Sequence, residues 1–153
     1  MISILNQHDY EGMTRRVEHI SKESTPLWGK MTAHEMVCHA TDIVRDVLGV
    51  RQVEPMTPPE MRPQIIAMVI TENEWDKNID TFPPYLQGEG GGGTKPVDFE
   101  SDKRTLLDLL RRLYETDDQF QFSPHAGLGI LSREQNGVFI WKHTDHHLRQ
   151  FGL

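Results

Sequence analysis

Three histidines stand close together near the C-terminus, in the stretch WKHTDHHLRQF, at positions 143, 146 and 147. Imidazole is the side chain that most often binds metal ions, and it exchanges protons near neutral pH. His143 and His147 are four residues apart, so on a helix both rings lie on one face, one turn from each other. This spacing allows two imidazoles to reach a single metal ion.

Apolar residues flank this pair at helical spacing, so we expect His143 and His147 to interrupt an apolar helix face that points into the core. The face comprises Phe139, Ile140, His143, His147 and Phe151. His146 falls on the other side of the helix with Lys142 and Arg149. We therefore predict that His146 is solvated and that the pair that matters is His143 with His147.

An earlier segment supplies a third candidate ligand, His39. It lies at the edge of an apolar stripe formed by Met36, Ala40, Ile43 and Val47. If the two helices face each other, His39, His143 and His147 form a three-histidine metal site. Nitrogen donors suit zinc, and also nickel, cobalt or iron(II), better than calcium or magnesium. Zinc is our first expectation for the bound divalent metal ion and nickel the second.

Three protein ligands leave one coordination position open, which is typical of a catalytic metal site. Glu35 lies one turn before His39 and Asp42 one turn after it. Either carboxylate could orient a ligand or act as a general base, and we name both as candidate catalytic residues. Each could equally be an ordinary charge on a helix surface. The three histidines could likewise be hydrogen-bonded core residues that hold no ion.

Two other stretches imitate known sites. GEGGGGTK, residues 88–95, lacks the GK[ST] order of a phosphate-binding loop, and we interpret it as a flexible connector. HEMVCH places His34 and His39 five residues apart rather than four, so these two cannot hold one ion from one helix face. Cys38 is the single cysteine and has no CxxC partner, which predicts a small buried side chain without a reactive role.

Signals for helix ends are clear along the chain. TAHE and SREQ are capping boxes that open helices over about 33–48 and 132–150, and Gly49 is placed to end the first. Leucines at helical spacing predict a helix from FESD onward, and a shorter helix precedes them near the N-terminus. Residues 50–98 form a long irregular connection with one short helix expected in PEMRPQIIAMVI. No alternating pattern is sustained, so the predicted fold class is all-α, a four-helix bundle.

Length and composition limit the classes of function. A chain of 153 residues, 37% hydrophobic and 25% charged, suits one globular domain over 1–153. The net charge of -7 does not favour binding to the phosphate backbone of a nucleic acid. No stretch approaches the roughly 18 apolar residues of a membrane span. We therefore expect a cytoplasmic protein that acts on a small molecule, with no nucleic-acid or membrane partner, and exposed helix faces leave a homodimer open.

The chain also resembles a known family in three stretches, PLWGKMTAHEMVCHATDIVRDVLG, DFESDKRTLLDLL and HAGLGILSREQNGVFIWKHTDHHLRQFGL. It is similar to the DinB-like (YfiT-like) superfamily of metalloenzymes, in a branch whose members are mostly of unknown function. This resemblance implies an up-down-down-up four-helix bundle. It implies a divalent metal held by one histidine of the second helix and an HxxxH pair of the last, which match His39, His143 and His147. It also implies a transferase or isomerase that uses a low-molecular-weight thiol as cosubstrate.

One loop departs from the pattern of this branch. Residues 125–132 read HAGLGILS, where the branch usually has HPxFGxLS, and we interpret His125 as structural rather than as part of the site. Two alternatives to thiol transfer stay open. One is a metal-dependent hydrolase in which Glu35 or Asp42 handles the proton. The other is a non-catalytic helical module that binds metal or dimerises.

Overall fold

The computed structural model describes all residues, Met1 to Leu153, and contains five α-helices, two 3-10 turns and no β-strand. Four long helices pack together: α1 (Gln7–His19), α2 (Ala33–Val47), α4 (Phe99–Tyr114) and α5 (Arg133–Gln150). Three short elements lie in the connection between α2 and α4: η1 (Pro59–Met61), α3 (Arg62–Val69) and η2 (Pro83–Tyr85). The predicted all-α fold is confirmed, and no helix combines the length and apolar character needed to cross a bilayer.

The ends of α2 and α5 follow the local sequence. The Thr32 hydroxyl accepts the amide of Glu35, and the Glu35 carboxylate accepts the amide of Thr32. Ser132 and Gln135 make the same reciprocal pair at the start of α5. Gly49 follows α2 at φ +71°, a left-handed conformation that glycine adopts without steric cost. Each such cap stabilises its helix by about 1 kcal/mol. The helices that carry the candidate ligands begin and end close to the predicted residues.

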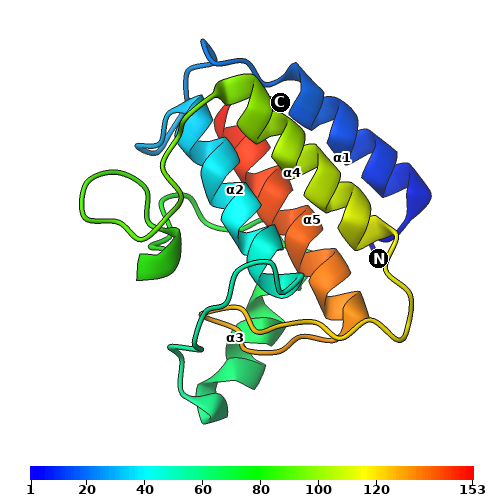
Figure 1. The fold of residues 1–153 in the computed structure, drawn as a ribbon. Coiled ribbons are helices and arrows are strands. Elements are labelled where there is room, and N and C mark those ends of the chain that lie inside the picture. The colour runs from blue at the N-terminus through cyan, green and yellow to red at the C-terminus, as the bar shows by residue number, and fades with distance from the viewer.

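The long helices form two pairs of opposite direction. His34 in the first turn of α2 bonds to Asp102 in the first turn of α4 at 2.6 Å, so these two helices run the same way. α1 and α5 run together in the other direction (Figure 1). α2 packs against both α4 and α5. The side chains of α2 therefore face protein on most sides.

The apolar stripes of these helices meet in one core. The predicted stripe of α2, comprising Met36, Ala40, Ile43 and Val47, is at most 2% exposed. Leu106, Leu110 and Leu113 of α4 are equally buried. Burying one such aliphatic side chain contributes about 1.5–3 kcal/mol relative to leaving it in water. Helix α5 presents Phe139 and Ile140 to the same core, which brings the predicted histidine face of α5 toward α2.

The connection between α2 and α4 covers the face of α5 that the sequence marks as polar. The Lys142 ammonium group donates to the carbonyl oxygens of Thr71 and Asn73, at 2.5 and 2.6 Å. The Trp75 ring lies 5.7 Å from the His146 ring. His146 is only 6% exposed, so the prediction that it is solvated is wrong. Helical periodicity assigns a polar face but does not reveal that a distant segment folds over it.

The glycine-rich loop, residues 88–93, is a defined turn folded onto η2. The Gly93 amide donates to the Leu86 carbonyl oxygen at 3.0 Å. A side chain on Gly91 would overlap that same carbonyl, which is why the close backbone approach requires glycine here. Since the loop binds its own chain in this way, it has a structural role and does not form a phosphate cradle.

Two carboxylates on α2, both with no exposed surface, anchor the connection. Asp42 accepts hydrogen bonds from the amide and the hydroxyl of Thr94, at 2.7 and 2.6 Å. Asp46 accepts two bonds from the Arg51 guanidinium group, at 2.6 and 3.0 Å. Arg51 opens the connection and Thr94 lies near its end, so both ends of this long segment are tied to the same helix.

We expect the substitution Asp46→Ala to lower the free energy of unfolding by about 1–3 kcal/mol, because it removes two charge-assisted hydrogen bonds and leaves Arg51 with Asp42, at 3.3 Å, as its remaining carboxylate partner. Urea unfolding measures this change. Asp118→Ala is the matched control: Asp118 pairs with Arg133 but its side chain is 87% exposed, and its loss should cost no more than about 0.5 kcal/mol. Equal effects of the two substitutions would contradict the anchoring role.

Candidate metal centre

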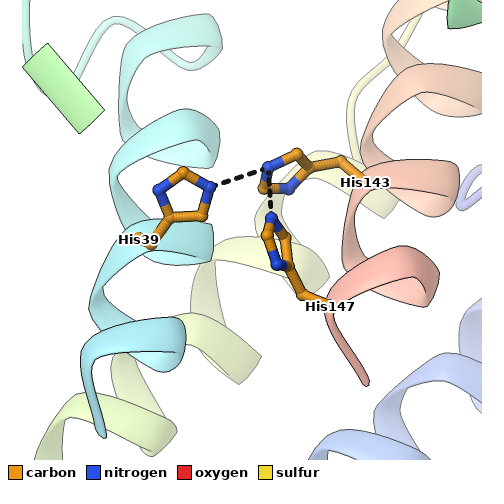
Figure 2. Close-up of side chains that lie close together, drawn as sticks. All are labelled: His39, His143 and His147. Atoms are coloured by element: carbon orange, nitrogen blue, oxygen red, sulfur yellow. Dashed lines mark hydrogen bonds between the residues drawn. The ribbon is translucent and has the colours of Figure 1, made fainter. Parts of the chain in front are cut away.

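His39 of α2 meets His143 and His147 of α5 in the core between the two helices (Figure 2). The Nε2 atom of His143 lies 3.1 Å from Nε2 of His39 and 3.1 Å from Nε2 of His147. All three side chains are buried, at 3%, 6% and 8% exposure. The structure therefore brings together the three histidines that the sequence selects, and no carboxylate or thiol belongs to their group.

Hydrogen bonds on the far side of two rings determine which nitrogen carries the proton. His39 Nδ1 lies 2.9 Å from the carbonyl oxygen of Tyr85, and His147 Nδ1 lies 2.6 Å from the side-chain oxygen of Gln150. Both oxygens accept, so both Nδ1 atoms donate, and Nε2 of each ring turns a lone pair toward His143. The Nε2 atom of His143 can donate only one proton. One of the two lone pairs therefore lacks a donor, whereas a cation at the centre would satisfy all three rings.

The spacing of the nitrogens is close to that of a metal site. Metal–nitrogen bonds of about 2.0–2.1 Å in tetrahedral geometry place neighbouring nitrogens about 3.3–3.4 Å apart. The observed separations from His143 are 3.1 Å. A widening of a few tenths of an ångström would thus complete the coordination, with a fourth position left for a water molecule or a substrate.

Burial keeps the three rings neutral. It is the main cause that holds the pKa of His143 and His147 well below the ordinary value, and the neighbouring imidazoles add to it. Burial also lowers the pKa of His39, although the bond to Tyr85 and the negative charge of Asp42 oppose the shift. Neutral imidazole is the form that binds metal ions. The cluster is therefore ready to bind a cation at neutral pH without first losing a proton.

Gln150, which holds His147, is itself held by the turn before α2. The Leu27 amide donates to the Gln150 carbonyl oxygen at 2.6 Å. Gly29 lies at φ +83°, and a Cβ atom there would stand 2.6 Å from the Gln150 amide nitrogen. Glycine at this position therefore leaves room for the side chain that orients His147.

Sequence reasoning missed both orienting groups. Gln150 stands three residues after His147, which is a contact distance on a helix and a signal that could have revealed it. Tyr85 contributes only its backbone carbonyl. No residue type marks a carbonyl group in advance, and Tyr85 lies in the long connection, far from His39 in sequence.

The two candidate catalytic carboxylates have partners away from the histidines. Glu35 is bonded to Thr32 within the capping box, and Asp42 is bonded to Thr94. Neither makes a hydrogen bond to any of the three rings, and Asp42 acts on His39 only through its charge. A catalytic role for Glu35 or Asp42 stays a prediction.

His125 supports the site from the loop that precedes α5. Its Nδ1 atom accepts the amides of Gly127 and Leu128 at 3.0 and 3.2 Å. Its ring stacks on Tyr85 with centroids 4.9 Å apart, and burial lowers its pKa to about 3. These contacts agree with a structural role, since His125 packs against the residue whose carbonyl orients His39.

A cavity of about 470 Å³ lies on the other side of α5 from the core. Its lining includes Trp75, Lys142, His146 and Arg149. Trp75 also lies 6.0 Å from the His143 ring, and His146 lies 5.2 Å from the His147 ring. The side chains of Trp75 and His146 therefore form the wall between the histidine cluster and this cavity, whose volume suits a small molecule.

No protein-family model, curated protein or solved structure matches the chain. What the structure supports is an all-helical protein with a buried group of three histidines that could hold a metal ion.

We expect the substitution Gln150→Leu to weaken metal binding about 10–100-fold, because His147 loses the acceptor that orients its ring. Competition with a chromophoric chelator measures the affinity for zinc. Gln64→Leu, at an exposed position of α3, is the control and should bind zinc as the unmodified chain does. Unchanged affinity in Gln150→Leu would show that the acceptor is not needed.

Proposed function

We propose that this protein holds one divalent metal ion through His39, His143 and His147 and is an enzyme that uses a low-molecular-weight thiol. The observation that supports a bound metal is that the Nε2 lone pairs of His39 and His147 both face the Nε2 atom of His143. Only one of them can receive a proton from His143. Burial of an unsatisfied acceptor costs about 1–3 kcal/mol, and a cation removes that cost for the whole cluster.

The donor set favours zinc, with nickel as the second candidate. Three neutral imidazoles and no carboxylate suit borderline metals rather than magnesium or calcium. When bound, such an ion offers an open position at which the pKa of a thiol or a water molecule falls toward neutrality. The Nδ1 hydrogen bonds of His39 and His147 keep the donor atoms aimed at that ion.

Two observations support thiol chemistry. The resemblance to the DinB-like superfamily implies it, and the two parallel helix pairs are the arrangement expected of an up-down-down-up bundle. The cavity beside α5 is lined by Lys142 and Arg149 but also by three carboxylates, and Arg149 is paired with two of them, Glu74 and Asp145. Its charge therefore does not select an anionic molecule, and its support for the proposal is limited to a volume that suits a small thiol or electrophile. In the proposed reaction the thiolate sulfur forms a bond to an electrophilic carbon. The leaving group departs with its electron pair, and the thiol proton passes to solvent.

The hydrolytic alternative has less support. It requires a general base within hydrogen-bond reach of a metal-bound water, and the carboxylates of Glu35 and Asp42 are bonded to Thr32 and Thr94 instead. Thiol transfer needs no such base once the metal has acidified the thiol. Because the structure shows no free general base at the cluster, thiol transfer is favoured over hydrolysis.

The metal is tested by elemental analysis of the untagged protein after reconstitution. We expect His39→Ala, His143→Ala and His147→Ala each to lose one metal equivalent per chain relative to the unmodified protein. His146→Ala is the matched control, since His146 is buried beside His147 but outside the cluster, and it should lose none. If the unmodified chain binds no metal, the three histidines are core residues and the proposal fails.

The reaction is tested with a chromogenic aryl halide and a panel of low-molecular-weight thiols. The metal-loaded protein should consume the halide at least about tenfold faster with thiol than without, and His147→Ala should abolish this difference. Turnover with water alone would instead indicate hydrolysis, and Glu35→Gln or Asp42→Asn should then reduce it about a hundredfold or more. No turnover of any substrate, with metal bound, would leave a non-catalytic binding module.

A further inference from the structure

A second group of potential metal ligands lies on a different side of α2 from the three-histidine cluster. His34 and Cys38 stand one turn apart on α2, and Asp102 reaches them from α4. One ligand atom from each lies within 4.8 Å of the others. Cys38 and His39 are successive residues, so their side chains diverge by about 100° around the helix. The two groups therefore belong to different interfaces, α2 with α4 and α2 with α5.

The distances within this group are near those of a tetrahedral site. Metal bonds of about 2.1 Å to nitrogen or oxygen and about 2.3 Å to sulfur would place the ligand atoms roughly 3.4–3.6 Å apart. The Cys38 sulfur lies 3.8 Å from Asp102 Oδ2, and His34 Nε2 lies 2.6 Å from the same oxygen. Opening the His34 contact by less than about 1 Å would make room for an ion.

The chemistry of the group suits zinc. A thiolate and a carboxylate carry two negative charges, which balance a divalent cation, and a neutral imidazole adds a third donor. Histidine, cysteine and aspartate are all established types of zinc ligand. Without a metal, burial and the negative charge of Asp102 raise the pKa of the Cys38 thiol to about 12, so the sulfur keeps its proton. A bound cation reverses that preference, since a coordinating thiol is deprotonated.

The site is accessible and supported. The side chains of His34 and Asp102 are 13% and 23% exposed, so an ion can enter from solvent, while Cys38 lies behind them at 2% exposure. The Val97 amide donates to Asp102 Oδ2 at 3.2 Å, and the His34 ring packs edge-on against Phe99. These contacts hold the two outer ligands in place, as supporting groups do in zinc sites.

We propose that His34, Cys38 and Asp102 form a second binding site for a borderline divalent cation of the zinc class. The site is independent of the three-histidine cluster. Binding replaces the hydrogen bond between His34 and Asp102 with three metal bonds. The thiol proton is released to solvent, and a water molecule takes the fourth position. The cation would join the first two turns of α2 to the first turn of α4.

Cobalt(II) is the probe, because a sulfur ligand gives it an intense near-ultraviolet charge-transfer absorption that nitrogen and oxygen ligands do not give. Cys38 is the single cysteine of the chain, so this absorption reports on this site alone. We expect it to appear when the metal-free full-length protein is titrated with cobalt(II), and to appear equally in His143→Ala. His143→Ala removes a ligand of the three-histidine cluster and leaves the second group intact. It therefore shows which of the two proposed sites fails, if one does.

Three variants complete the test. Cys38→Ala should lose the absorption altogether, and Asp102→Asn should lose it or bind cobalt on the order of tenfold or more weakly. Asp108→Asn, at an exposed position of α4, is the matched control and should behave as the unmodified chain does. Circular dichroism of the metal-free proteins verifies that each variant is folded, and His34→Gln replaces any variant that is not. Absence of the charge-transfer absorption in the unmodified protein, or an unchanged cobalt(II) titration midpoint and amplitude in Asp102→Asn, would overturn the second site.

Discussion

The burial of the polar side chains of α2 is the constraint on which the rest of the structure depends. This helix lies between α4 and α5, and His39, Asp42 and Asp46 are almost wholly removed from solvent. A buried polar group without a partner costs about 1–3 kcal/mol, and a charged one costs more. Each of these side chains must therefore find its partner in another element. The long connection supplies Arg51, Thr94 and the Tyr85 carbonyl, which explains why an irregular segment is held so closely against the bundle.

The same constraint makes the histidine cluster a preorganised site. Its three donors come from two helices whose ends are capped, and their orientation comes from one group in the long connection and one at the last residue of α5. The Tyr85 carbonyl fixes His39, and Gln150, held by the turn at Gly29, fixes His147. Helices thus carry the ligands, and hydrogen bonds to η2 and to the end of α5 orient them. Because all three ligands lie on helices, which move less than loops, the positions of the three nitrogens relative to one another are well defined.

Much of the site could be predicted because it depends on helical periodicity. Four residues separate His143 from His147, and this spacing places both rings on one face whatever the rest of the protein does. His39 was identified because it borders an apolar stripe that had to be buried. The solvation of His146 was predicted wrongly by the same reasoning, since periodicity describes only one helix and Trp75 reaches His146 from a distant segment. The proximity of Asp102 to His34 was equally out of reach, because it depends on which helix packs beside α2.

The sequence by itself determined the helices, their ends and the faces they bury, since capping, propensity and periodicity act over a few residues and do not depend on the fold. It also placed His143 and His147 on an inward face, although it did not show that His146 is buried as well. Only the tertiary structure decided that these inward faces meet with three Nε2 atoms converging, and that the Tyr85 carbonyl accepts a hydrogen bond from His39 Nδ1. It also decided that a cysteine without a nearby partner in sequence lies beside a histidine and an aspartate. The physical reason is that such contacts join residues distant in sequence, and their formation depends on how all the buried faces pack at once.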